Sequence, residues 1–156
     1  MYTSILLSVA LQDWERYSAH ALAAREAAAT LAKGAAIPLH VLSVYENEAG
    51  PVPAGLDSEM AARHRTDMLQ RTDALMEQRM RDFLAPLRDA GLEVNPILRV
   101  GNPRAVIVET ARSVLADLLI IGSHSKRGLL DIALGGTARQ ITHAAPCTIL
   151  MVSPKG

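Results

Sequence analysis

The sequence predicts an α/β fold, in which a parallel β-sheet is covered by helices on both faces. Short apolar runs typical of strands alternate with longer segments of helical spacing along the chain, which is the order of elements that parallel sheets require. The strand segments are almost continuously apolar, as expected for strands buried on both sides. The 156 residues match the usual size of one domain, so we expect residues 1–156 to form a single domain.

The first half of the chain predicts two strands and two helices. An apolar run at 4–9 is followed by an alanine-rich segment in which Trp14, Tyr17, Leu22, Ala28 and Leu31 recur near helical spacing, which predicts a helix that ends at Gly34. Asp13 is the expected N-cap of this helix. In the long helix further on, methionines recur at helical spacing, which predicts packing in a core or a dimer interface. The predicted elements are a strand at 4–9, a helix at 13–33, a strand at 37–45, a flexible loop at 46–58 and a helix at 59–85, whose methionines are Met60, Met68, Met76 and Met80.

The second half predicts three strands and two helices. Pro96 lies inside the third strand and places it at a sheet edge, because proline cannot donate a hydrogen bond to a neighbouring strand. Asn102 is suited to cap the next helix, and Pro103 to occupy its first position. Gly122 ends the fourth strand. The predicted elements are a strand at 92–100, a helix at 103–115, a strand at 118–121, a helix at 135–144 and a strand at 148–152.

The composition excludes several classes of protein. Sixteen basic and sixteen acidic residues cancel, so no overall field attracts nucleic acid or an anionic membrane. No apolar stretch approaches the roughly 20 residues that a membrane-spanning helix needs. Cys147 is the only cysteine, which excludes an internal disulfide and favours a reducing compartment. We therefore expect a cytoplasmic protein. The five histidines show no metal-ligand spacing.

A glycine-containing loop after the fourth strand is the main candidate for a binding site. Ligands of open parallel sheets bind at the carboxyl ends of the strands, and the loop 122–128 leads from such an end toward Gly135, Gly136 and Thr137 at a helix start. Glycines let the backbone approach an anion, and helix N-terminal amides point at it. Lys126 and Arg127 can offset phosphate charge, although a solvated loop tip explains them equally well. A tight strand-to-helix connection is the structural alternative for the glycines.

Several motifs together resemble the universal stress protein family over nearly the whole chain. They are Gly101-Asn102-Pro103, the run from Ala116 to His124, Leu134-Gly135-Gly136-Thr137 and Ala145-Pro146-Cys147. The resemblance implies a Rossmann-like fold of the adenine nucleotide alpha hydrolase type. It further implies a five-stranded parallel sheet in the order 3-2-1-4-5 and a homodimer formed through the last strand.

The resemblance also implies an adenine nucleotide as ligand, ATP, ADP or AMP, with or without magnesium. ATP-binding relatives carry Gly-x-x-Gly, nine residues, then Gly followed by Ser or Thr. These four positions fall here on Gly122, Ser125, Gly135 and Gly136, while Thr137 can supply the displaced hydroxyl. Ala10 stands where such relatives usually have a ribose-binding aspartate, and Val44 matches the position whose backbone meets adenine. The candidate nucleotide-binding residues are Val9, Ala10, Val44, Ile121, Gly122, His124, Ser125, Gly135, Gly136 and Thr137.

Three functions stay open at this point. The leading hypothesis is a non-enzymatic regulatory stress-response protein that binds an adenine nucleotide and presents its surface to an unknown protein partner. The second is a homodimeric interaction module whose site no longer binds nucleotide, which Ala10 favours. The third is a slow ATPase, for which Asp131 is the nearby acid in the loop.

Overall fold

The computed structural model describes residues 1–12, 17–122 and 136–155, with residues 136–139 described by their backbone only. Its strands form one sheet in the order β3-β2-β1-β4-β5, and every neighbouring pair is parallel. The predicted fold class and strand order are therefore confirmed. The elements are β1 (Ile5–Ser8), α1 (Ala19–Ala35), β2 (Leu39–Tyr45), α2 (Ser58–Asp89), β3 (Val94–Val100), α3 (Pro103–Ser113), β4 (Leu118–Gly122), α5 (Gly136–Ala144) and β5 (Thr148–Val152).

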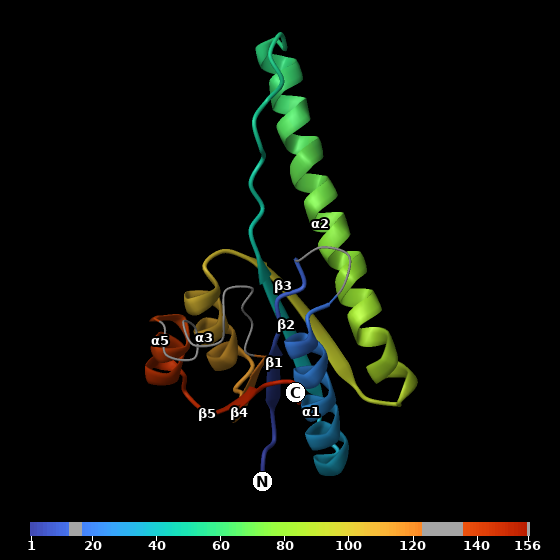
Figure 1. Ribbon diagram of the computed structural model, residues 1–156, viewed down its shortest axis with the longest axis vertical. Helices are drawn as coiled ribbons and strands as arrows, with labels where there is room; N and C mark the ends of the chain where they lie inside the picture. The colour runs from blue at the N-terminus through green and yellow to red at the C-terminus, as the bar shows by residue number, and fades with distance from the viewer. Residues whose placement is uncertain (13–16, 123–135, 156) are drawn as a thin grey trace.

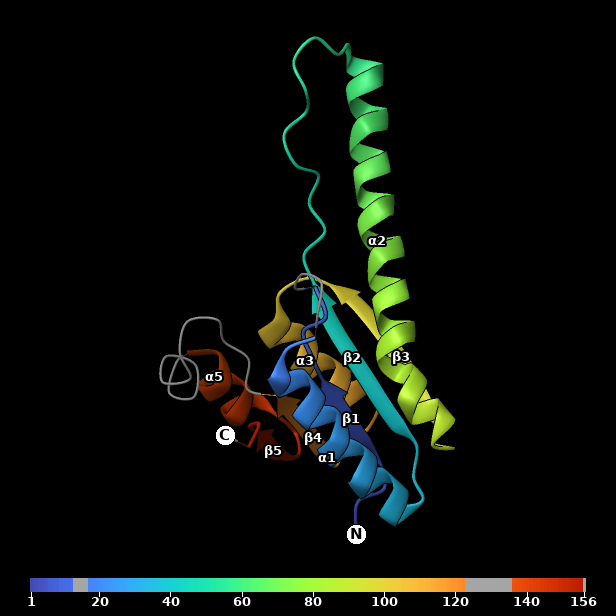
Figure 2. The ribbon, with the colours of Figure 1, turned by 45° about the vertical axis from the view of Figure 1, so that its right-hand side comes forward.

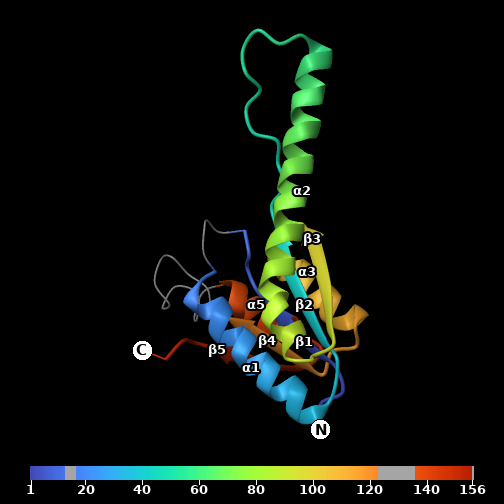
Figure 3. The same ribbon diagram turned by 90° about the vertical axis from the view of Figure 1, so that its right-hand side faces the viewer.

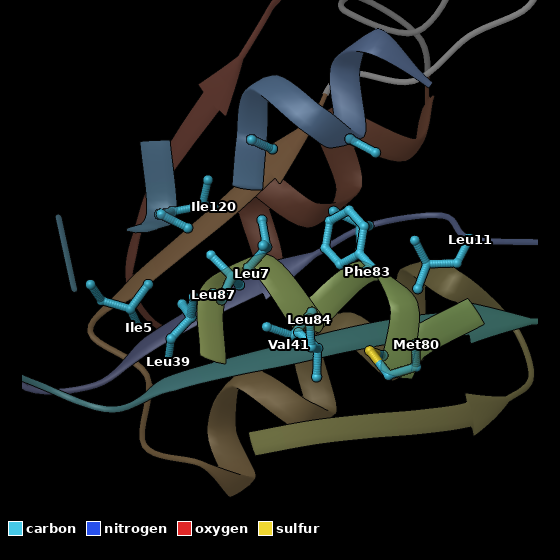
Figure 4. Packing of buried hydrophobic residues seen from close by; sticks show 14 of the residues in the cluster. Ile5, Leu7, Leu11, Leu39, Val41, Met80, Phe83, Leu84, Leu87 and Ile120 are labelled. Carbon is cyan, nitrogen blue, oxygen red and sulfur yellow. The ribbon is translucent and has the colours of Figure 1, made fainter. Parts of the chain in front are cut away.

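The two faces of the sheet carry different pairs of helices (Figures 1 and 3). Helices α1 and α2 cover one face, where Phe83 and Leu84 of α2 point toward the strand residues Leu7 and Val41 (Figure 4). Helices α3 and α5 cover the opposite face in a smaller cluster around Leu6 and Leu119. Both faces of the central strands are thus buried, as their continuous apolar sequences predict.

Strand β3 lies at the edge of the sheet, as Pro96 predicts. The N–H of Leu39 donates to the carbonyl of Glu93, and the N–H of Gly101 donates to the carbonyl of Tyr45, so the odd-numbered residues of β3 face β2. Backbone direction alternates along a strand, which turns the backbone groups of Pro96 outward. The missing N–H therefore costs no bond within the sheet, and it deprives the open edge of one donor.

Helix α1 packs through alanines, and its two ends correct two predictions. Its N-cap is Ser18, whose side chain accepts from Ala21 N–H, and not Asp13. Its last turn includes Gly34, and the left-handed residue that ends it is Ala36 (φ 55°). Leu31 is exposed. The buried residues are Ala21, Ala24, Ala28 and Ala32. Their small side chains let the helix backbone approach the sheet closely, which larger leucines would prevent.

Helix α2 extends well past the sheet, and residues 46–57 run alongside its projecting half without forming a helix or strand (Figure 2). Tyr45 at the end of β2 and Asn47 in this segment both bind the helix through their side chains. Tyr45 donates to Asp73 at 2.6 Å, and Asn47 donates to both Asp73 and the carbonyl of Leu69. Met76 and Met80 are buried, which confirms core packing for these two, whereas Met60 on the projecting part is 50 % exposed and lies outside this core. Packing of Met60 in a dimer interface stays a prediction. The flexibility of this loop stays a prediction.

Candidate functional site

The carboxyl ends of β1, β2 and β4 bring together the candidate residues from three distant parts of the chain. Ser8 pairs with Leu42 of β2 on one side and with Ile121 of β4 on the other. Val9 and Ala10 follow Ser8 directly. Continuing the same register places Val9 level with Gly122 and Ala10 level with Val44. Ala10 and Ile121 are half-buried, whereas the side chains of Val9 and Val44 are buried. The site therefore offers a surface of backbone and the apolar side chains of Ala10 and Ile121.

The segment after β1 is held in place by bonds from three other elements. Leu11 N–H donates to Ser43 Oγ at 3.3 Å, and the Leu11 carbonyl accepts from Arg79 Nε of α2. Gln12 Nε2 donates to the carbonyl of Glu46 at 2.7 Å, while Gln12 Oε1 accepts from Glu46 N–H at 2.9 Å. This reciprocal pair joins the segments that follow β1 and β2. It fixes the edge of the site at which Ala10 and Val44 lie.

Gly122 at the end of β4 lies against the first turn of α1. A Cβ on Gly122 would lie 2.7 Å from the carbonyl oxygen of His20 and 3.2 Å from the Cβ of Ala24. Real Cβ atoms do not approach backbone oxygens so closely, and a close backbone approach is one of the reasons a strand carries glycine. Close packing of α1 on β4 is thus sufficient to require glycine here.

The N-terminal ends of α3 and α5 complete the described surroundings. Asn102 caps α3 by accepting from Arg104 N–H at 3.0 Å, and Pro103 begins the helix, as predicted. Helix α5 begins at Gly136, so Gly136 and Thr137 lie in its first turn. Such helix ends favour anions. His124, Ser125 and Gly135 lie outside the described residues, as do Asp13, Lys126, Arg127 and Asp131.

Tyr45 and Asp73, two titratable groups near the end of β2, join this strand to α2 through a hydrogen bond. Burial of Tyr45, its hydrogen bond to Asp73 and the charges of Asp73 and Glu77 raise its pKa to about 12. Tyr45 therefore stays protonated and donates to Asp73 throughout the physiological pH range. Within the described residues, no three His, Cys, Asp or Glu side chains lie close enough to hold a metal ion.

Comparison with known proteins decides the family. The model of the universal stress protein family matches residues 1–153. The chain belongs to the universal stress protein family. Over 152 residues it is 28 % identical to a universal stress protein of Thermus aquaticus, which covers 97 % of this chain and 99 % of that protein. The universal stress protein MJ0577 of Methanocaldococcus jannaschii is 32 % identical over 79 residues, or 51 % of this chain.

Some of these matches are partial. The chain matches only 40 % of the length of universal stress protein A homolog 2 of Coxiella burnetii and 49 % of MJ0577 in sequence. In structure, however, MJ0577 covers 100 % of this chain over 99 % of its own length, with a TM-score of 0.74 at 22 % identity. The whole universal stress protein fold is therefore present here.

Two solved relatives with a bound nucleotide share this fold. A universal stress protein of Arabidopsis thaliana with AMP bound has a TM-score of 0.68 at 20 % identity, and covers 99 % of this chain and 93 % of its own. A universal stress protein in complex with cAMP has a TM-score of 0.67 at 17 % identity, and covers 99 % and 98 %.

Sequence reasoning missed the contacts that shape the site. The Gln12–Glu46 pair, the bond from Arg79 to Leu11 and the contact of Gly122 with His20 each join residues far apart in the chain. No local pattern in the sequence marks such contacts.

No helix among the described residues is sufficiently long and apolar to span a membrane.

Proposed function

We propose that this chain binds an adenine nucleotide at the carboxyl ends of β1, β2 and β4 and acts as a regulatory homodimer of the stress response. The observation that carries the proposal is the meeting of Ala10, Val44 and Gly122 at neighbouring strand ends. Relatives of the same fold bind AMP and cAMP. We propose further that residues 1–156 work as one cytoplasmic domain.

In this proposal the base and the phosphates contact different elements. The backbone at Val44 meets adenine, and the first turn of α5 with Thr137 meets the phosphates, together with the loop that carries His124 and Ser125. Ala10 leaves the ribose without a carboxylate partner. A lost hydrogen bond to a charged group weakens binding by about 1.5–3 kcal/mol, which lowers affinity without abolishing it.

Thermal unfolding with AMP, ADP, ATP and magnesium, and with GMP as the matched control, tests the binding proposal. A ligand that binds only the folded state raises the melting temperature, by the equivalent of about 2.7 kcal/mol at a hundredfold excess over Kd. We expect a rise with the adenine nucleotides and a smaller one with GMP. An unchanged melting temperature at millimolar adenine nucleotide would contradict the proposal.

The homodimer is proposed to form through β5, the second edge of the sheet. Leu150 and Met151 of this strand are 36 % and 41 % exposed, and apolar side chains at an open edge favour pairing with another strand. A second copy of the chain would cover both the side chains and the unpaired backbone groups.

One specific observation favours a second candidate, a homodimeric interaction module that binds no nucleotide. The contact between Gly122 and His20 explains the glycine without any ligand, and Ala10 offers no polar atom to a ribose. This candidate predicts an intact dimer and a melting temperature that does not change when nucleotide is added.

Slow ATP hydrolysis stays the third possibility, and a hydrolysis rate abolished by Asp131→Asn would establish it.

A further inference from the structure

The half of α2 that projects beyond the sheet is covered on one side by the segment 46–57 (Figure 2). Asn47 Nδ2 donates to the carbonyl of Leu69 at 3.1 Å, and a Cβ on Gly50 would lie 3.2 Å from Cε of Met68. Among the described residues, no other segment runs beside this half of the helix (Figures 1 and 3). The rest of the helix surface here therefore faces water.

A stripe of five residues follows the uncovered side. Met60, His64, Asp67, Arg71 and Leu75 succeed one another at intervals of three or four residues, which places them on one face of the helix. Met60 is 50 % exposed and Leu75 is 54 % exposed, so two large apolar side chains lie in water. Asp67 and Arg71 are exposed between them. Within the described part of the chain, neither takes part in an ion pair or a side-chain hydrogen bond.

This stripe is complementary to a second copy of itself that runs in the antiparallel direction. If Met60 faces the partner's Leu75, a two-fold axis places Leu75 opposite the partner's Met60 at the other end of the contact. Asp67 then lies within one turn, about 5 Å along the axis, of the partner's Arg71, which a long side chain spans. A parallel pair would place like charges opposite each other, which disfavours it.

We propose that two copies of this chain pair through the arm, residues 46–75, with their α2 helices antiparallel. The pairing covers Met60 and Leu75 and gives Asp67 and Arg71 the partners that they lack in the described part of one chain. It needs no nucleotide, and so does not depend on the proposed function.

The contact is small and weak. It spans about four turns of each helix, and interfaces below about 1,200 Å² belong to transient associations. Helix α2 packs beside β3, at the edge of the sheet opposite to β5. Pairing of the arms is thus compatible with a homodimer through β5, and it should join such homodimers as the protein concentration rises.

Disulfide crosslinking tests the antiparallel register. The test protein carries Met60→Cys and Leu75→Cys together with Cys147→Ser. Within one chain the first two positions lie about 22 Å apart, far beyond the reach of a disulfide, so only two chains can form the bond. Air oxidation should give a covalent dimer on a non-reducing gel. Met60→Cys or Leu75→Cys alone, with Cys147→Ser, should crosslink much less, because the proposed register holds identical positions about 22 Å apart. Equal crosslinking by single and double variants would overturn the proposal.

Exchange of the two charges tests the contact without new cysteines. Asp67→Arg or Arg71→Asp alone places like charges in contact twice per interface, and should weaken the association about fivefold or more. The double variant Asp67→Arg/Arg71→Asp should restore it. Arg65→Asp is the control for Arg71→Asp, because Arg65 is also exposed on the arm but lies about 120° around the helix.

Sedimentation velocity at rising concentration and low ionic strength measures this association. The wild type and Arg65→Asp should associate equally. A double variant as weak as the single variants would overturn the proposal, and so would single variants that associate like the wild type. A wild type that shows neither concentration-dependent association nor crosslinking of its cysteine variants would also overturn it, and would leave the stripe for a different protein.

Discussion

The carbonyl oxygen of His20 lies 2.7 Å from the position that a Cβ of Gly122 would occupy. Gly122→Ala should therefore push α1 away from β4 and destabilise the protein by about 1–3 kcal/mol, as overpacking of a core does. The measurement is the free energy of unfolding in urea, without ligand. Loss of nucleotide binding in this variant would not by itself identify a phosphate cradle.

Gly34→Ala is the control for this substitution. No atom lies within 4 Å of the position of its Cβ, and Gly34 lies in the last turn of α1. Alanine there should stabilise the helix by about 0.5–1 kcal/mol. If Gly122→Ala were as stable as the wild type, the close packing of α1 on β4 would be excluded as the reason for this glycine.

Ala10→Asp should strengthen nucleotide binding. Ala10 is half-buried at the end of β1, so a small polar side chain fits there, and a carboxylate can accept from a ribose hydroxyl. The expected gain in AMP affinity is about tenfold or more, measured by calorimetry. Ala10→Asn, which has the same size without the charge, should gain less. Unchanged affinity in a stable Ala10→Asp protein would show that the ribose does not lie beside residue 10.

The prediction from sequence succeeds where the signal is local. Asn102 caps α3 because its side-chain oxygen can accept a hydrogen bond from a free N–H at the helix start. Pro96 marks the edge strand because it has no N–H to donate to a neighbouring strand. It fails at α1, where Asp13 and Ser18 are both suitable caps. The backbone after β1 is held at Leu11 by Ser43 and Arg79, from distant elements, and the helix begins only beyond it. Of the residues at helical spacing in α1, Ala28 is buried but Leu31 is exposed, because close approach of this helix to the sheet requires alanines.

The candidate site divides in the same way. The alternation of strands and helices predicts that the carboxyl ends of the strands meet at one edge of the sheet. The strand order that places Val9, Ala10, Val44 and Gly122 together comes from the resemblance to the family. The hydrogen bond between Arg104 and Gln140 could not be predicted, since it depends on how α3 packs against α5.

Asp117 makes the folded state sensitive to acid. Burial alone would raise the pKa of Asp117, but hydrogen bonds from Ser4 N–H, Thr3 N–H and Thr3 Oγ1 outweigh it and lower the pKa from its ordinary value of 3.8. The unfolded chain thus takes up this proton first as the pH falls. The stabilising contribution is complete well above 3.8 and is lost as the pH falls through the lowered pKa.

This contribution is measurable as the difference in unfolding free energy between the wild type and Asp117→Asn at several pH values. The difference should be largest near neutral pH and should shrink below the ordinary pKa. Thr3→Val removes only the hydroxyl donor and should lose part of the effect. A difference that does not depend on pH would show that the three bonds do not favour the ionised carboxylate.

Met151→Glu should convert the homodimer to a monomer. A charge on the exposed edge strand β5 would be buried without a partner in the proposed interface. Light scattering after size-exclusion chromatography gives the molar mass directly. Leu115→Glu is the control, because Leu115 is 82 % exposed beyond the end of α3 and should leave the mass unchanged. If Met151→Glu stays dimeric, the interface lies elsewhere on the chain.

Calorimetric titration of the nucleotide-stripped wild-type protein with AMP and ATP tests the central claim most directly. The account predicts micromolar binding of at least one of them, with one site per chain, despite the absence of a carboxylate at Ala10. No heat at millimolar nucleotide, together with an unchanged melting temperature, would contradict it. The second candidate, a homodimer that acts without nucleotide, would then describe the protein better.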